Sequence, residues 1–178
     1  MTVAAALFDT ALGRIGLSWR DDVILAVQLP ESDDETTMIR LARTVGMMTP
    51  AEPTPAISAA MAAIVDLLDG RSADLDFIEI DLGERSAFDA AVYDVTRAIP
   101  AGESLTYGEV AERVGQPGAA QAVGRAMGAN PVPIIVPCHR VLGAKGQLIG
   151  FSAAGGVETK RRMLLIEGCP AVPPSLFD

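Results

Sequence analysis

The chain is poor in cysteine and histidine and contains no long apolar run. Its 178 residues include two cysteines, Cys138 and Cys169, and a single histidine, His139. That inventory excludes a disulfide framework and a closed zinc site of Cys and His, so the sequence predicts no metal centre. No stretch reaches the roughly 18 to 20 apolar residues of a membrane helix, and the N-terminus lacks the pattern of a signal peptide. We therefore expect a cytoplasmic protein with no membrane partner.

Basic residues are scarce in the first half of the chain only. Residues 1–83 carry 14 acidic and five basic side chains, whereas residues 84–178 carry nine of each, which together give the net charge of −9. A net charge of this sign speaks against nucleic-acid binding by the whole chain, but the second half keeps Lys and Arg for phosphate contacts. The shift in charge predicts two domains, 1–83 and 84–178.

Short apolar segments and turns organise the first half as a small α/β domain. Helical spacing of apolar residues predicts a helix from Ile57 to Leu68, and alternation predicts a strand over 75–82. The polar run 31–37 is expected to be a solvated loop. The three apolar segments that come first are separated by turn-prone residues and predict an antiparallel meander: 4–8, 15–19 and 23–28.

The second half is predicted to be mainly helical. Ser86 can cap one helix, and Thr106 with Glu109 forms a capping-box pattern that starts another. A short turn and a second helix over 119–129 follow, which is the order of a helix-turn-helix unit. The small residues of that second helix permit close approach either to a nucleic-acid groove or to a neighbouring helix. A last helix over 157–167 is expected to hold Lys160, Arg161 and Arg162 on a solvated face.

One stretch combines the residue types of nucleophilic catalysis. Residues 130–141 deliver Cys138 and His139 side by side after an apolar run. A cysteine nucleophile reacts as the thiolate, and an adjacent imidazole can take the thiol proton directly or through water. A carboxylate that orients the imidazole completes such a relay, and Glu167 is a candidate. The alternatives for an isolated Cys-His pair are a buried inert thiol and a histidine whose hydrogen bonds are satisfied.

With its surroundings, this stretch resembles the O6-alkylguanine-DNA alkyltransferases (methylated-DNA–protein-cysteine methyltransferases). The similarity covers about residues 86–168 closely, and residues 1–83 only loosely. It implies a mixed α/β (α+β) fold, with a small ribonuclease-H-like N-terminal domain followed by a helical, winged-helix-like DNA-binding domain. The resemblance is carried by these segments: Pro137-Cys138-His139-Arg140-Val141, Asn130-Pro131, Gly150-Phe151-Ser152, Lys160 to Gly168, Ile99-Pro100, Thr106-Tyr107 and Ala122-Val123-Gly124.

The resemblance implies a role for each matching residue. Cys138 would accept the alkyl group in a single, stoichiometric event without a cofactor, and His139, oriented by Glu167, would take the thiol proton. Tyr107 would give a proton to the departing guanine, and Asn130 would hold the turn that shapes the site. Arg140 is expected to brace the structure. The substrate pocket would be lined by Ser152, Phe151, Gly150 and Pro133. The segment 152–156 is longer than in some relatives, and its small side chains suggest room for alkyl groups beyond methyl.

The implied partner is double-stranded DNA that contains O6-alkylguanine, with O4-alkylthymine as a further possible substrate and the protein acting as a monomer. The target base would be rotated out of the duplex from the minor groove. The family places an arginine in the gap, whereas this chain has Gln121 there, with Arg125 one turn later. Base flipping is therefore expected to be weaker. The other groove-facing positions implied are Ala119, Ala120, Ala122 and Gly124.

Three other interpretations remain open at the level of sequence. A Cys-His hydrolase or acyl transferase would use the same pair with turnover. A non-catalytic protein that recognises alkylated bases would need no acceptor cysteine, so the presence of Cys138 argues against it, although Gln121 leaves room for impaired chemistry. A redox regulator would pair Cys138 with Cys169, which lies beyond the last predicted helix and is more simply an incidental thiol.

Overall fold

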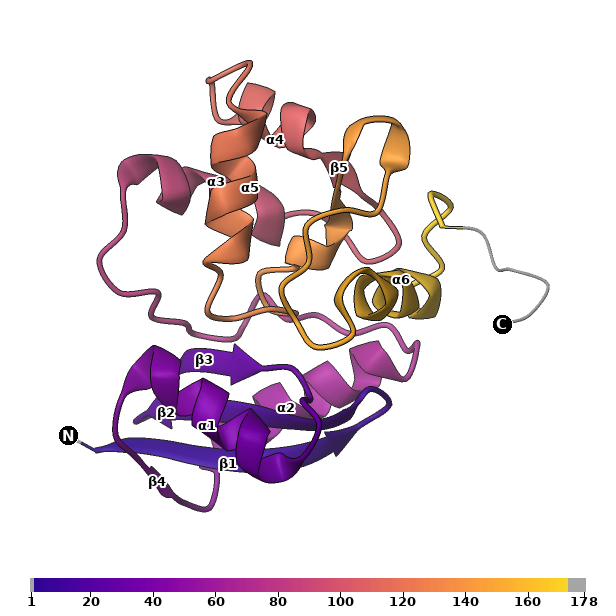
Figure 1. Cartoon of the computed structure of the whole chain (residues 1–178). Coiled ribbons are helices and arrows are strands. Elements are labelled where there is room, and N and C mark those ends of the chain that lie inside the picture. The colour runs from indigo at the N-terminus through magenta and orange to yellow at the C-terminus, as the bar shows by residue number, and fades with distance from the viewer. Residues whose placement is uncertain (1, 173–178) are drawn as a thin grey trace. The chain divides into compact units, whose positions relative to one another are not determined.

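A four-stranded sheet organises the first part of the chain in the computed structural model, which describes residues 2–172 (Figure 1). Three strands form the predicted meander: β1 (Val3–Thr10), β2 (Gly13–Arg20) and β3 (Val23–Gln28). A short strand, β4 (Met48–Pro50), pairs parallel to β1 and gives the order β3-β2-β1-β4. Sequence analysis missed β4 because three residues carry no readable alternation.

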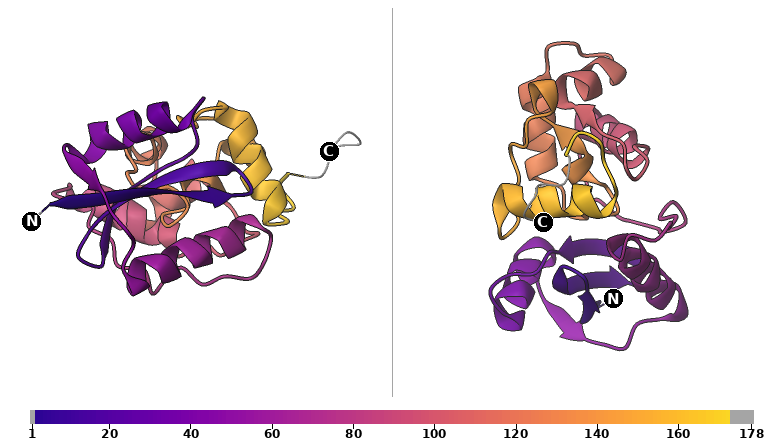
Figure 2. Two further views of the ribbon diagram at one scale, coloured as in Figure 1. Left: turned by 90° about the horizontal axis from the view of Figure 1, so that it is seen from below. Right: turned by 90° about the vertical axis from the view of Figure 1, so that its right-hand side faces the viewer.

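Two helices cover the sheet, α1 (Asp34–Val45) and α2 (Pro55–Leu68). The left view of Figure 2 shows them on opposite faces. α1 packs Leu41 with Ala5 and Ala26 of the strands, and α2 buries Ile57 and Ile64. The start of α1 contradicts the expected loop over 31–37. Asp33 caps it by accepting from Thr36 N, so the polar run is a capped first turn.

The predicted strand over 75–82 is reduced to a single bridge. Ile80 pairs with Ile24 of β3, through Ile24 N to Glu79 O and Asp81 N to Ile24 O, both at 2.9 Å. The rest of the predicted strand does not pair with β3, because its backbone amides bond within the segment. Ile78 N donates to the carbonyl of Leu75, and Asp76 N donates to the side chain of Asp74. Strand pairing stops where the chain satisfies its own backbone groups locally.

The described part of the second compact unit, up to residue 172, holds four α-helices: α3 (Ala87–Arg97), α4 (Tyr107–Arg113), α5 (Ala120–Gly128) and α6 (Gly156–Ile166). Ser86 caps α3, and both halves of the Thr106–Glu109 capping box on α4 are formed, as predicted. Tyr93 of α3 donates to the carbonyl of Ala126 at 2.7 Å and so ties α3 to α5. Strands β5 (Leu105–Thr106) and β6 (Val141–Leu142) pair in parallel beside these helices.

The chain divides by internal contacts into Met1–Gly83 with Pro131–Ile135, and Glu84–Asn130 with Val136–Asp178. The segment Pro131–Ile135 thus packs with the first unit, where the carbonyl of Pro131 accepts from Val27 N at 2.8 Å. None of the helices in residues 2–172 combines the length and apolarity needed to cross a bilayer. The mixed α/β class expected from the sequence is confirmed.

Candidate active site

Cys138 opens a tight 3-10 turn, Cys138–Arg140, immediately before β6. The residue is 8% exposed, and its backbone amide donates to the carbonyl of Val136 at 2.8 Å. The register of β5 against β6, Leu105 beside Val141, brings the start of α4 close to this turn. The pairing of these two short strands therefore brings Tyr107 and Cys138, which are far apart in sequence, to one region of the unit.

Asn130 closes the loop that precedes the turn. Its Nδ2 donates to the carbonyl of Val136 at 2.8 Å, across the five residues that pack with the first unit. Within those five, the buried Ile134 has a φ of +76°, which is uncommon for a β-branched residue. The amide of Asn130 thus fixes the entry to Cys138, and a hydrogen bond from Asn130 also acts to lower the pKa of the thiol.

His139 is almost completely buried, with 1% of its surface exposed, and its two ring nitrogens differ in their environment. Nε2 lies 2.8 Å from Oε1 of Glu167, at the end of α6. Nδ1 is buried and has no hydrogen-bond partner among residues 2–172. Because an ionised carboxylate only accepts, Nε2 carries the hydrogen and Nδ1 presents its lone pair. That arrangement leaves a buried base free to take one proton.

Arg140 holds Glu167 in a fork. Its Nε donates to Oε2 at 3.0 Å and its Nη2 to Oε1 at 2.8 Å, while Nη1 donates to the carbonyl of Ile99. Burial alone raises the pKa of Glu167, but the hydrogen bonds and charges of His139 and Arg140 outweigh it and hold that pKa at about 2. Glu167 is therefore an anion throughout the physiological range.

Burial determines the resting protonation states of Cys138 and His139. Burial raises the pKa of the Cys138 thiol, against the opposing effects of Asn130 and of the charge on Lys160. Burial lowers the pKa of His139, although Glu167 works in the other direction. Both groups are thus neutral at pH 7, as thiol and imidazole, and a thiolate arises by transfer of the proton.

The expectation that Lys160 lies on a solvated face of the last helix is wrong, because its side chain is fully buried. Its Nζ donates to the carbonyls of Val141 at 2.5 Å and Ile149 at 3.0 Å, and lies 5.6 Å from the centre of the Tyr107 ring. Burial lowers the pKa of Lys160 to about 8. Sequence analysis missed this residue because a Lys-Arg-Arg run looks like a charged surface. Its helical offset, three residues before the buried Met163, was the available signal.

Tyr107 stands at the start of α4 and meets the loop after β6. Its hydroxyl donates to the carbonyl of Ile149 at 3.2 Å. Gly150 has a φ of +65°, and a Cβ there would lie 3.0 Å from the Tyr107 oxygen, so glycine is needed at this close approach. Burial and the nearby Cys138 raise the pKa of Tyr107, which keeps the phenol protonated.

The expected pocket residues come from two segments of the chain, which belong to different units. Gly150 lies against Tyr107, Phe151 is half-buried and Ser152 is exposed on the following loop. Pro133 belongs to the segment that packs with the first unit, whereas the other three lie in the second. In the described part of the chain, no three His, Cys, Asp or Glu side chains gather as a metal site.

α5 places the expected DNA-contacting residues on one helix. Gln121 and Arg125 are exposed one turn apart, while Val123, Ala126 and Met127 face the interior. No side chain caps its N-terminus at Ala119. The small residues Ala119, Ala120, Ala122 and Gly124 are half-buried between these faces.

Comparisons with known proteins agree on one family. Residues 87–169 match the family model described as 6-O-methylguanine DNA methyltransferase, DNA binding domain. The methylated-DNA–protein-cysteine methyltransferase of Mycolicibacterium paratuberculosis is 37% identical over 89% of this chain and 88% of its own length. The Salmonella typhimurium protein of the same name is 46% identical over 59% of this chain and 60% of its own length.

Solved structures extend the similarity over nearly the whole fold. The O6-methylguanine methyltransferase of Mycobacterium tuberculosis superposes with a TM-score of 0.76 at 34% identity, covering 99% of this chain and 100% of that one. The same organism's OGT in complex with DNA gives a TM-score of 0.77 at 34% identity, covering 98% and 99%. With its buried Cys138–His139–Glu167 arrangement, the chain belongs to the methylated-DNA–protein-cysteine methyltransferase family.

Proposed function

We propose that this protein repairs DNA by transferring the alkyl group of O6-alkylguanine to Cys138, once per molecule. The observation that carries the proposal is the unpartnered, buried Nδ1 of His139, whose Nε2 is held by Glu167 and which directly follows the buried Cys138 in the chain. A relative with this fold has been solved in complex with DNA, which supports DNA as the partner.

The transfer follows from the protonation states. The proton of Cys138 passes to Nδ1 of His139, directly or through a water, and the sulfur attacks the alkyl carbon attached to O6. The S–C bond forms as the C–O6 bond breaks, and the electron pair of that bond leaves with guanine. The resulting imidazolium is stabilised by Glu167, and the charge of Lys160 favours the thiolate before attack.

Tyr107 supplies the proton that neutralises the departing guanine. Its phenol stays protonated at neutral pH because of its raised pKa, so it is a donor rather than a base. Tyr107 is left as a phenolate and His139 as an imidazolium, so one proton passes from His139 to Tyr107 through solvent after the product leaves and both groups return to their neutral forms. Regenerating Cys138 would require breaking the S–C bond of the thioether with a thiolate as leaving group, and no described residue of the site promotes that step, so the reaction ends after one equivalent.

DNA binding is assigned to α4 and α5 as a helix-turn-helix pair. α5 presents Gln121 and Arg125 on its exposed face, and its small residues permit close approach to a groove. The target base must leave the stack to reach Cys138, which is 8% exposed. The small residues 152–156 support a pocket for alkyl groups larger than methyl.

The decisive test is the amount of guanine restored. Duplex oligonucleotide with one O6-methylguanine is added in tenfold excess, then digested and analysed for guanine. We expect one equivalent of guanine per protein and none with Cys138→Ser. Repeated turnover would instead indicate a hydrolase, and lesion binding without restoration would indicate a recognition protein.

A further inference from the structure

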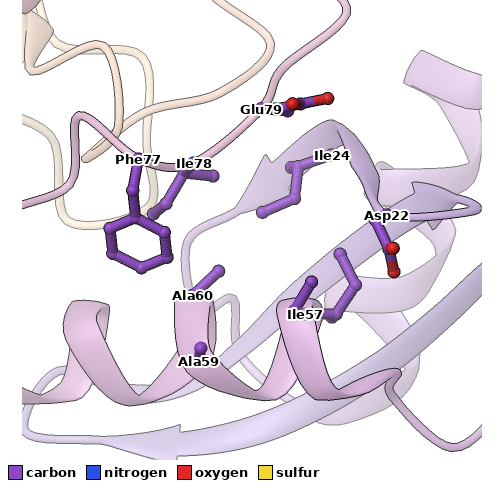
Figure 3. A pocket seen from close by; sticks show the side chains of 9 residues that line it. Asp22, Ile24, Ile57, Ala59, Ala60, Phe77, Ile78 and Glu79 are labelled. Atoms are coloured by element: carbon purple, nitrogen blue, oxygen red, sulfur yellow. The ribbon is translucent and has the colours of Figure 1, made fainter.

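A hollow of about 370 Å³ opens on the first unit, between α2, the β2–β3 hairpin and the segment that bridges to β3 (Figure 3). This volume lies within the range of small-molecule sites. All of its lining residues belong to the first unit, so it is not part of the Cys138 site. They are Asp22, Ile24, Ala56, Ile57, Ala59, Ala60, Phe77, Ile78 and Glu79.

The hollow exists because α2 presents alanines where larger side chains would fill it. Ala56, Ala59 and Ala60 recur at helical spacing on one face of α2. Phe77 stands beside them and remains 54% exposed, instead of turning inward to bury its ring. An exposed aromatic ring next to unfilled apolar surface is typical of a binding site.

The charged lining residues are both acidic. In the view of Figure 3, Phe77 and Asp22 stand at opposite ends of the hollow, and Glu79 lies along its rim. Asp22 accepts a hydrogen bond from the Thr54 hydroxyl at 2.6 Å, and Thr54 is itself fixed as the N-cap of α2. The carboxylate is thus oriented before any ligand arrives.

No basic side chain neutralises these two carboxylates within residues 2–172. Three of the five arginines of the first unit, Arg14, Arg40 and Arg71, pair with other acidic residues. The hollow therefore joins an apolar wall to uncompensated negative charge. A ligand that matches it has an apolar body and a positive end.

We propose that this hollow binds a small organic cation. Its apolar part packs against Phe77 and the α2 alanines, and its ammonium or amidinium group lies at Asp22 and Glu79. The proposal is independent of alkyl transfer, because none of these residues belongs to the unit that contains Cys138.

The probe for this site is 2-phenylethylammonium, followed by NMR shifts of the alanine methyl groups of α2 in the full-length protein. We expect saturable shifts confined to the hollow, with a Kd in the millimolar range, as suits a probe of this size. The neutral 2-phenylethanol and the anionic 3-phenylpropionate are expected to bind at least about threefold more weakly, because they lack the charge. Equal binding of all three, or no saturable shift, would overturn the proposal.

Variants separate charge from shape. Asp22→Asn and Glu79→Gln are each expected to weaken binding about two- to fivefold, as for exposed ion pairs. Ala59→Leu fills the hollow at an exposed position of α2 and should abolish the shifts with both carboxylates kept. Glu35→Gln, on α1, is the matched control and should leave the Kd unchanged. A loss in Glu35→Gln equal to that in Glu79→Gln would mean nonspecific attraction and would also overturn the proposal.

Discussion

One oxygen of Glu167, Oε1, lies 2.8 Å from Nε2 of His139, and the same oxygen accepts from Nη2 of Arg140. The carboxylate is thereby held as an anion that fixes the imidazole tautomer. Glu167 raises the pKa of His139, and the positive charge of Arg140 at the same oxygen lowers it. Glu167 thus orients His139 without keeping it permanently charged.

Glu167→Gln should slow alkyl transfer by about 10²-fold, the low end of what a general base contributes. The glutamine keeps an acceptor near Nε2 but loses the charge that stabilises the imidazolium. Since Glu167 raises the pKa of His139 against the effect of burial, its removal should move the acidic limb of the pH–rate profile to lower pH. Single-turnover kinetics between pH 5 and 9 measure both effects. An unchanged profile would show that Glu167 only supports the fold.

Acid should destabilise the protein through Glu167. Its pKa is about 2 in the folded state, against 4.5 for an unperturbed glutamate side chain, so its contribution is complete above pH 4.5 and is lost as the pH falls toward 2. Urea unfolding across this window should show stability falling with acidity. The slope contributed by Glu167 should disappear in Glu167→Gln, whereas Glu158→Gln, at an exposed position of α6, should keep it.

Lys160→Met should loosen the loop between β6 and α6. The substitution keeps the aliphatic stem of the side chain but removes the Nζ donor to the carbonyls of Val141 and Ile149. The Ile149 carbonyl keeps the Tyr107 hydroxyl, whereas the buried Val141 carbonyl loses its Nζ donor, at a cost of about 1–3 kcal/mol. Amide exchange should accelerate over 143–150, and transfer should slow because Tyr107 shares the Ile149 carbonyl. Arg162→Met, exposed on the same helix, is the control and should change neither.

Gln121→Arg should increase the rate of transfer from duplex DNA, because a planar cation fills the place of the extruded base better than a neutral amide. The rate with a free O6-alkylguanine base, which requires no flipping, should stay the same. Arg125→Gln tests the position one turn later. It should weaken duplex binding and reduce the slope of log Kd against log salt concentration by about one. If Gln121→Arg leaves the duplex rate unchanged, the flipping account is wrong.

Several helices and strands of the fold could be predicted because their sequence signals are local. The Ser86 cap, the Thr106–Glu109 box and the three-stranded meander are each encoded within a few residues. α1 was missed because its polar start outweighed the stripe of Met38, Leu41 and Val45, although Asp33 offered a readable cap. Local polarity is thus a weak guide where a capped turn begins a helix.

The candidate site could be predicted in its residue types but not in its assembly. The Cys-His pair and Glu167 are 28 residues apart, and only tertiary packing brings the carboxylate to Nε2. The burial of Lys160 and the fork of Arg140 depend on carbonyls supplied by Val141, Ile149 and Ile99, which no motif specifies. The hollow on α2 likewise arises from what the alanines leave unfilled.

The most direct test of the central claim is the intact mass of the protein after incubation with duplex DNA that carries one O6-methylguanine. The account predicts a gain of about 14 Da, the mass of one methylene, that stops at one equivalent and maps to the peptide with Cys138. Cys138→Ser should gain nothing, and Cys169→Ser should behave as the unaltered protein. A protein that stays unmodified while guanine is restored, or that carries the methyl group at Cys169, would contradict the account.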